Sequence, residues 1–262
     1  EMNNKELLEI AKKAALKSWK EIMHIYSWDF WVEIKEDNSP ITIADKLANK
    51  IILKELKQTN IKVLSEEQKD NLNRLDSEYL WIIDPIDGTK DFINKTWEFS
   101  IMIWLTKNWK PILWVIYVPS KNKLYFAEKN KWSYLEDNWK ISKLKININN
   151  NKILISRNHT TNIELELIEQ LWLDSILCWS IWVKLWLIAE WKAWNYINLY
   201  KTFNEWDTCA PEIILTEAWW KVTDTIWNTL FYNKKLSYQN WCIWTNWINH
   251  NKILNKLKIN ND

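Results

Sequence analysis

Two aspartates separated by two residues are the strongest candidates for chemistry. Asp84 and Asp87 follow an apolar run, residues 80–83, that predicts the end of a buried strand. Pro85 fixes φ between them and removes one backbone N–H, and Gly88, the only glycine in the chain, lets the backbone approach a ligand closely. Mg²⁺ prefers oxygen ligands and usually keeps waters for a phosphate-bearing substrate. The spacing therefore indicates a seat for a hard cation, although aspartates in a turn also accept backbone N–H groups.

Further carboxylates lie on elements that precede this corner. A helical period of apolar residues predicts helices over 3–26 and from 41 to about 56. Asp45 falls in the first turn of the second helix, where the dipole favours a carboxylate, so capping alone could explain it. Residues 61–64 predict a strand, and Glu66 follows at its carboxyl end, where ligand sites of α/β sheets gather. A Glu-Glu pair at this point is otherwise an ordinary solvated charge run.

The residues after the corner predict a layered α/β architecture with sheets between helices. Between residues 98 and 128, alternating apolar and polar positions predict an antiparallel meander. Residues 129–151 add a further hairpin and an Asn/Lys-rich connection. We therefore expect one domain of two lobes, about 1–150 and 151–262, of which the second closes the site.

The second lobe carries another candidate ligand. Strands are predicted at 153–155 and 195–199, and a buried helix at 181–190. A further helix is expected from 205 to about 218, with Asp207 at or near its N-terminus. A carboxylate there either caps the helix or faces the metal.

These motifs resemble those of the inositol monophosphatase superfamily, which are Mg²⁺-dependent, lithium-sensitive phosphomonoesterases. The central match is D-P-I-D-G-T at residues 84–89. A D-N-S-P-I-T-I-A-D stretch at 37–45 and a W-D-T motif at 206–208 occur in the expected order. The resemblance covers nearly the whole chain, and three separated motifs are more specific than any one of them.

The resemblance implies a site for two or three Mg²⁺ ions. Glu66, Asp84 and the carbonyl of Ile86 would hold the first ion. Asp84, Asp87 and Asp207 would hold the second. Oxygen ligands of this kind suit Mg²⁺, whereas thiolates and imidazoles select other metals.

The resemblance also assigns roles in catalysis and phosphate binding. Asp45 and Thr89 would orient and deprotonate the attacking water as a positioned general base, and Glu66 belongs to the same catalytic set. Asp87 and the backbone N–H groups of Gly88 and Thr89 would hold the phosphate, as turn amides can.

Within the superfamily, the chain is similar to the 3'(2'),5'-bisphosphate nucleotidases. The stretches at 87–92 and 206–212 match that branch. His159 falls on a histidine that meets the nucleotide, although a loop histidine in water explains it equally well. Lys184 falls on a lysine used toward a phosphate, and a second phosphate on the substrate gives a cation there physical sense. Asn198 departs from the pattern, because several nucleotidases carry a substrate arginine there.

We therefore expect hydrolysis of the 3'(2')-phosphate of adenosine 3'(2'),5'-bisphosphate to AMP and phosphate. An inositol or other sugar monophosphate is the alternative substrate. The charge balance, 35 basic against 33 acidic residues, argues against a nucleic acid polymer as partner. No apolar run reaches membrane-spanning length, and the N-terminus does not read as a signal peptide. Three cysteines without C-x-x-C spacing indicate reduced thiols in the cytoplasm. A homodimer is left open.

The composition is physically unusual, with 1 Gly and 23 Trp, where glycine usually makes up about 7% of residues. Turns closed by Asn-Gly need φ > 0, which glycine adopts freely. Four Asn-Trp pairs stand where Asn-Gly would close such a turn: Asn108-Trp109, Asn138-Trp139, Asn240-Trp241 and Asn246-Trp247.

Our hypothesis is that most of these tryptophans are glycines in the living protein, because UGA is read there as glycine. Trp81 and Trp206 are the expected exceptions, since the family carries tryptophan at both positions. The alternative is a non-catalytic module whose aromatic surface binds sugars or single-stranded nucleic acid. UGG codons at the Asn-Trp pairs would contradict the hypothesis.

Overall fold

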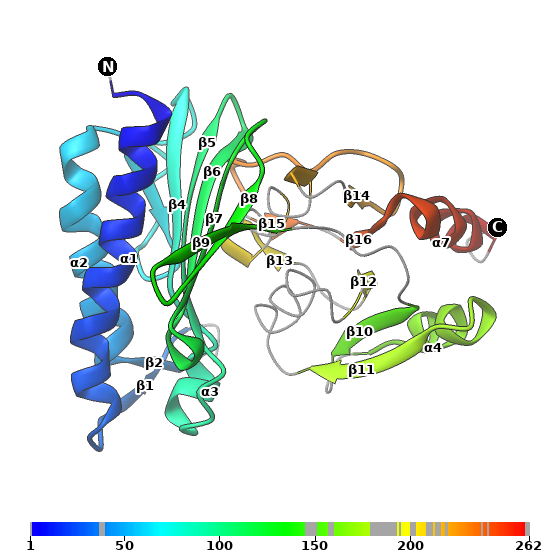
Figure 1. The fold of residues 1–262 in the computed structure, drawn as a ribbon, viewed down its shortest axis with the longest axis horizontal. Helices are drawn as coiled ribbons and strands as arrows, with labels where there is room; N and C mark the ends of the chain where they lie inside the picture. Colours follow the sequence, from blue (N-terminus) through cyan, green and yellow to red (C-terminus); the bar gives the residue numbers. More distant parts are fainter. Residues whose placement is uncertain are drawn as a thin grey trace.

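In the computed structural model, two large sheets lie side by side, and helices cover the outer face of each (Figure 1). The described residues are 2–36, 40–144, 151–156, 160–178, 193, 195–199, 203–207, 212, 216–217, 220–236, 238–239 and 241–259.

Two long helices form the first layer. α1 (Asn4–Tyr26) begins with a capping box, in which Asn3 and Glu6 each accept the backbone N–H of the other. α2 (Ile43–Leu56) begins with a second capping box between Thr42 and Asp45. The apolar stripes of both helices pack on one face of the larger sheet. Both predicted helices are confirmed.

The larger sheet has seven strands in the order β3-β4-β5-β6-β7-β8-β9. β3 and β4 are parallel, and every later pair is antiparallel. The predicted meander is confirmed. The strands are β3 (Lys62–Ser65), β4 (Tyr79–Asp87), β5 (Ser100–Lys107), β6 (Lys110–Val118), β7 (Lys123–Glu128), β8 (Ser133–Asp137) and β9 (Lys140–Lys143).

A five-stranded sheet follows, in the order β11-β10-β12-β16-β14. Its outer face packs against α4 (Asn162–Gln170) and α7 (Trp247–Ile259). The strands are β10 (Lys152–Ser156), β11 (Asp174–Cys178), β12 (Asn195–Asn198), β14 (Trp220–Asp224) and β16 (Cys242–Asn246).

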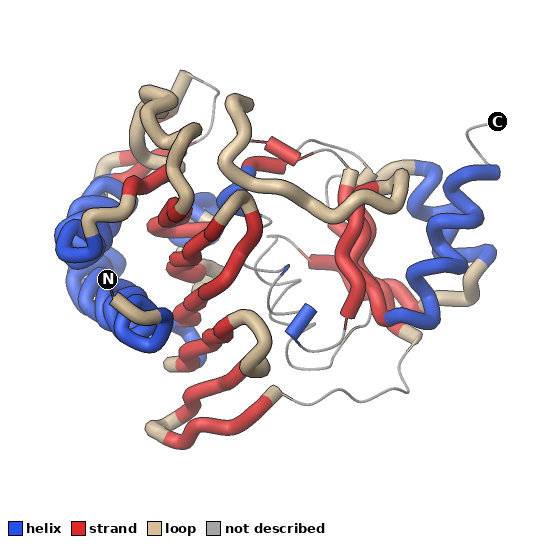
Figure 2. Tube along the Cα trace, turned by 90° about the horizontal axis from the view of Figure 1, so that it is seen from above, coloured by secondary structure: helices blue, strands red, loops and turns tan. Residues whose placement is uncertain are grey.

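The two sheets share an apolar core, so that they are the inner layers of a sandwich (Figure 2). Ile82 and Trp104 contribute from the first sheet, and Leu154 and Trp244 from the second. The predicted strands at 153–155 and 195–199 are confirmed, and the predicted helix at 181–190 lies outside the described residues. The sheets follow the order of the two expected lobes, whose division near residue 150 stays a prediction.

Short elements complete the described chain, in which no helix is long and apolar enough to cross a membrane. They are β1 (Val32–Ile34) paired with β2 (Pro40–Thr42), β13 (Phe203–Asn204) paired with β15 (Tyr238–Gln239), α3 (Thr89–Ile93) and the 3₁₀ turns Lys57–Thr59 and Pro119–Lys121.

Several tryptophans occupy backbone positions that suit glycine. In the pairs Asn108-Trp109 and Asn138-Trp139, φ is 47° and 64°, and 49° and 66°. Left-handed conformation at both residues is what a type I′ turn demands, so these two predicted turns are confirmed. The conformation costs a residue with a Cβ roughly 1–2 kcal/mol. Among the described residues, the further tryptophans at positive φ are Trp97, Trp132, Trp172 and Trp227.

Other tryptophans separate into different cases. The indole N–H of the buried Trp81 donates to Thr59 Oγ1 (3.1 Å), as expected of a native core tryptophan. The buried indoles of Trp104 and Trp114 lie opposite one another on β5 and β6, and neither N–H has an acceptor in the described part of the chain. The turn predicted at Asn246-Trp247 is wrong, because Trp247 begins α7 directly after β16.

Candidate functional site

The site begins where β4 leaves the regular ladder with β5. Asp84 pairs with Met102 and Asp87 with Ser100, so β4 has one more residue than β5 over this interval. Such a bulge re-aims side chains at a sheet edge, and Pro85, which has no N–H, costs the ladder nothing here. Gly88 follows at φ 92° and ψ 38°, a left-handed conformation that favours glycine.

Three carboxylates meet at this corner. Oxygen atoms of Asp84, Asp87 and Asp207 all lie within 4.8 Å of one another. Asp84 is 1% exposed, and burial raises its pKa well above the ordinary range, with further increases from the charges of Glu66, Asp87 and Asp207. The cluster therefore brings together three of the four acidic side chains predicted to bind metal. The fourth, Glu66, is near enough for its charge to raise the pKa of Asp84.

The carboxylate cluster fits a hard divalent cation. Oδ1 of Asp84 is buried and has no hydrogen-bond partner among the described residues. A buried anionic oxygen without a donor is costly, and neighbouring anions make it more so. A divalent cation coordinated by these oxygens would offset both costs, because it binds the unpaired oxygen and neutralises the repulsion between the carboxylates.

Asp207 makes a capping hydrogen bond and also belongs to the carboxylate cluster. Residues 205–207 are helical, and Oδ2 of Asp207 accepts the backbone N–H of Asn204 (3.0 Å). The same carboxylate belongs to the cluster with Asp84 and Asp87. Capping and facing the cluster are therefore compatible.

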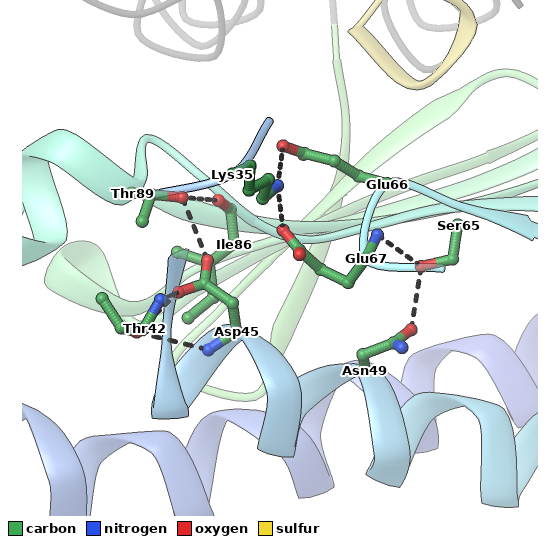
Figure 3. Close-up of polar contacts among 9 residues, drawn as sticks. All are labelled: Lys35, Thr42, Asp45, Asn49, Ser65, Glu66, Glu67, Ile86 and Thr89. Atoms are coloured by element: carbon green, nitrogen blue, oxygen red, sulfur yellow. Dashed lines mark hydrogen bonds and ion pairs between the residues drawn. The ribbon is translucent and has the colours of Figure 1, made fainter. Parts of the chain in front are cut away.

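Asp45 likewise caps a helix and faces the site (Figure 3). Its Oδ2 accepts the N–H (2.7 Å) and the O–H (2.5 Å) of Thr42, while its Oδ1 lies 3.0 Å from Thr89 Oγ1. Burial raises the pKa of Asp45, and the hydrogen bonds from Thr42 and Thr89 oppose that rise. Thr89 Oγ1 also lies 3.2 Å from the carbonyl oxygen of Ile86, and its single proton can serve only one of these acceptors at a time.

Lys35, which follows β1, and Glu67, in the loop after β3, lie beside Glu66, and the sequence assigned a role to neither. Lys35 Nζ lies 3.0 Å from Glu66 Oε1 and 2.7 Å from Glu67 Oε1 (Figure 3). Burial raises the pKa of Glu67 to about 7, with Lys35 opposing and Glu66 adding to the rise. Burial lowers the pKa of Lys35, but the two carboxylates raise it by more. No periodicity or motif distinguishes Lys35 from other lysines of the chain.

Hydrogen bonds to α2 and to β4 hold the loop after β3 in place. Ser65 Oγ donates to Asn49 Oδ1 on α2 (2.8 Å) and accepts the N–H of Glu67 (3.2 Å), and the N–H of Glu66 donates to the carbonyl of Ile83 (3.2 Å). Glu66 is thereby fixed beside β4. The predicted substrate residues His159 and Lys184 lie outside the described residues.

Comparison with known proteins gives consistent matches. Residues 3–261 match the model of the inositol monophosphatase family. The 3'(2'),5'-bisphosphate nucleotidase CysQ of Haemophilus influenzae is 32% identical over 241 residues, 88% of this chain and 89% of that protein. CysQ of Escherichia coli K12 is 32% identical over 230 residues, 84% and 91% of the two chains. The crystal structure of CysQ from Bacteroides thetaiotaomicron matches with a TM-score of 0.80 at 31% identity, over 94% and 99% of the chains.

Proposed function

The chain belongs to the inositol monophosphatase family, and from this premise we propose that it hydrolyses the 3'(2')-phosphate of adenosine 3'(2'),5'-bisphosphate to AMP and phosphate. The observation that carries the proposal is the cluster of Asp84, Asp87 and Asp207, with the buried Oδ1 of Asp84 left without a protein donor among the described residues. The nucleotide substrate is supported by the relatives named CysQ, each about a third identical to the chain.

The proposed cofactor is Mg²⁺, as two or three ions. Glu66, Asp84 and the carbonyl of Ile86 would hold one ion, and Asp84, Asp87 and Asp207 another. Bound Mg²⁺ supplies charge that stabilises the developing negative charge and lowers the pKa of a coordinated water. The crowding of carboxylates around the buried Asp84 supports this assignment, because the metal-free cluster is repulsive.

Asp45 and Thr89 are the residues proposed to move the proton of the attacking water. When the Thr89 hydroxyl donates to Asp45 Oδ1, its oxygen is left free to accept a proton from a water on its other side. Asp45 is oriented for this by Thr42, which holds its second oxygen. The pair would thus act as a positioned base.

The phosphate would lie against the turn after β4. The N–H groups of Gly88 and Thr89 belong to the start of α3, where helical N–H groups lack a partner within the helix. Gly88 has a left-handed backbone conformation and no Cβ, so no side-chain atom blocks the close approach of a phosphate to its N–H group. Asp87 adjoins both and would contact the same group.

The test is phosphate release from adenosine 3',5'-bisphosphate and from inositol 1-phosphate, in parallel and with Mg²⁺. The nucleotide should be cleaved with the higher kcat/KM, and lithium should inhibit. A preference for inositol 1-phosphate would overturn the substrate assignment and favour the sugar phosphatase. The assay should also be run on protein with glycine at the tryptophans of positive φ, because we expect glycine at these positions in the living protein.

A Trp-rich binding module is a weaker account of the same chain. The exposed Trp109, Trp139 and Trp172 lie on turns of separate elements, with φ of 64°, 66° and 53°. A stacking surface does not explain why each should have a backbone conformation suited to glycine.

We also propose that the enzyme acts in the cytoplasm, where a nucleotide substrate is available. The described cysteines Cys178 and Cys242 are buried thiols outside any disulfide, which agrees with a reducing compartment. A homodimer stays a prediction, which light scattering on the purified protein would check.

A further inference from the structure

Asp207 reaches the carboxylate cluster from a different part of the chain than its partners. Asp84 and Asp87 lie on β4, which is bonded to β3 on one side and to β5 on the other. Asp207 follows the two-residue strand β13 and lies in a helical turn, 205–207. A short turn of this kind needs further contacts to hold a carboxylate in place.

Glu205 supplies the first of these contacts. It is 0% exposed, and its two oxygens accept the backbone N–H groups of Asn233 (2.7 Å) and Lys234 (2.9 Å). Side chains two positions apart on a helical turn do not face each other. The side chains of Glu205 and Asp207 therefore extend from different sides of the turn, so Glu205 can anchor the turn while Asp207 lies in the cluster.

Asn233 passes the contact on to the segment before β4. Its φ of 62° is left-handed, and its side chain is buried. Oδ1 accepts from Arg74 Nη1 (2.7 Å), and Nδ2 donates to the carbonyls of Arg74 (2.9 Å) and Leu75 (3.2 Å). Every polar atom of this amide thus bonds to residues 74–75.

Arg74 completes the connection. Its guanidinium is buried and donates to Asp70 Oδ2 through Nη2 (2.7 Å) and Nε (3.1 Å), and to the carbonyl of Lys234 through Nη2 (2.9 Å). Arg74 and Asn233 are 159 positions apart in sequence. Hydrogen bonds to charged groups contribute more than neutral ones, about 1.5–3 kcal/mol each. The network therefore ties the approach to β4 to the turn that carries Asp207.

We propose that Asp70, Arg74, Asn233 and Glu205 form a positioning network for Asp207, whose integrity sets the affinity of the divalent cation held by that carboxylate. The inference rests on the proposed role of Asp207 as a metal ligand. A binding constellation must be held to within about 0.5 Å of its productive geometry. Loss of the network would free the 205–207 turn while leaving Asp84 and Asp87 on the sheet.

The test uses Mn²⁺ as probe, counted by the electron paramagnetic resonance of the free ion. Arg74→Met should weaken Mn²⁺ binding at one site by about 10-fold, the lower end for residues that orient metal ligands. Arg74→Lys keeps the positive charge but lacks the planar guanidinium with its several donors. This variant should therefore lose less Mn²⁺ affinity than Arg74→Met. It also carries the test if Arg74→Met does not fold.

Thr245→Val is the matched control. Thr245 is buried on β16 and contacts His250 Nδ1 on α7 (2.7 Å), and no hydrogen bond among the described residues joins it to the network. This variant should lower thermal stability and leave Mn²⁺ affinity unchanged. Equal Mn²⁺ affinities in Arg74→Lys, Thr245→Val and the unmodified protein would overturn the inference.

A double-mutant cycle gives the sharper result. In an Asp207→Asn background, Arg74→Met should cause no further loss of Mn²⁺ affinity, because the network acts through that carboxylate. Additive losses would contradict the proposal. Because no nucleotide is used, a protein that binds Mn²⁺ yet cleaves no bisphosphate would contradict the proposed function alone.

Discussion

The two sources of the carboxylate cluster are held in place by different forces. Asp84 and Asp87 belong to β4, which is hydrogen-bonded to β3 on one side and to β5 on the other. Each face of β4 packs in an apolar core. Asp207 is held through Glu205, which accepts two N–H groups from residues 233–234. One half of the site therefore depends on burial and ladder pairing, and the other on buried polar contacts.

The difference separates stability from metal affinity. Apolar burial is non-directional and scales with area, so its loss weakens the whole fold. Hydrogen bonds are directional, so their loss shifts a particular group. Substitutions in the two halves should consequently have distinct signatures.

The largest effect is expected at Asp87 itself. Asp87→Asn should lower kcat/KM by more than about 100-fold, beyond the usual effect of residues that only orient a ligand. The fold should persist, since the change removes a like charge from the neighbourhood of Asp84. Thermal unfolding in EDTA should match that of the unmodified protein, while stabilisation by Mg²⁺ should shrink. Unchanged activity would defeat the assignment.

The sheet half is tested by Ile103→Ala. Ile103 is buried opposite Ile83 on the neighbouring strand β5. Removing a buried isoleucine typically costs about 2–5 kcal/mol, which urea unfolding would measure. Mn²⁺ affinity of the folded protein should be unchanged, because the backbone ladder that positions Asp84 remains. A loss of affinity equal to that of Arg74→Met would erase the distinction between the halves.

A third prediction concerns acid sensitivity where α7 packs on the second sheet. His250 is 0% exposed between Thr223 (2.9 Å to Nε2) and Thr245 (2.7 Å to Nδ1). Burial lowers its pKa to about 4, and the charge of Lys221 acts in the same direction. In the unfolded chain the imidazole has an ordinary pKa of about 6.5. Between pH 6.5 and pH 4, His250 is therefore protonated in the unfolded chain and neutral in the folded chain.

The contribution of His250 to stability is therefore complete above pH 6.5 and is lost as pH falls toward 4. Between pH 7 and pH 5 the free energy of unfolding should fall by about 2 kcal/mol from this group. Urea unfolding at the two pH values gives the slope. His250→Gln should reduce the slope by that amount, and an unaltered slope would show that the acid sensitivity has another origin.

The smallest effect is expected at the turns. Trp139 and Trp31 are both 90% exposed, but only Trp139 has a positive φ, 66°. Trp139→Gly should stabilise the protein by about 1 kcal/mol, because glycine avoids the cost of the left-handed conformation. Trp31→Gly, the matched control, should bring no such gain. Equal effects would remove this support for glycine in the living protein.

Local patterns were sufficient for the half of the site that lies on the first sheet. The apolar run before Asp84 and the glycine after Asp87 each have a short-range physical cause. For Asp45, on α2, helix capping was an equally good explanation until the resemblance was considered. The resemblance to the family added Asp207, for which helix capping was the favoured interpretation of an isolated aspartate. Its observed bond to Asn204 shows why local chemistry alone was ambiguous.

The polar contacts between distant segments were not predictable in this way. Arg74 and Asn233 have no periodicity that pairs them across 159 positions. Lys35 became notable only when folding placed it against Glu66 and Glu67. Strands β11 and β14 were not predicted either, because such short segments are defined by pairing with their neighbours.

The central claim is that carboxylates from both sources surround a divalent cation. Anomalous diffraction from a crystal soaked in Mn²⁺ tests it most directly. We expect an anomalous peak within coordination distance, about 2.0–2.3 Å, of oxygens from Asp84, Asp87 and Asp207. Full Mn²⁺ occupancy elsewhere with no peak at this cluster would contradict the account.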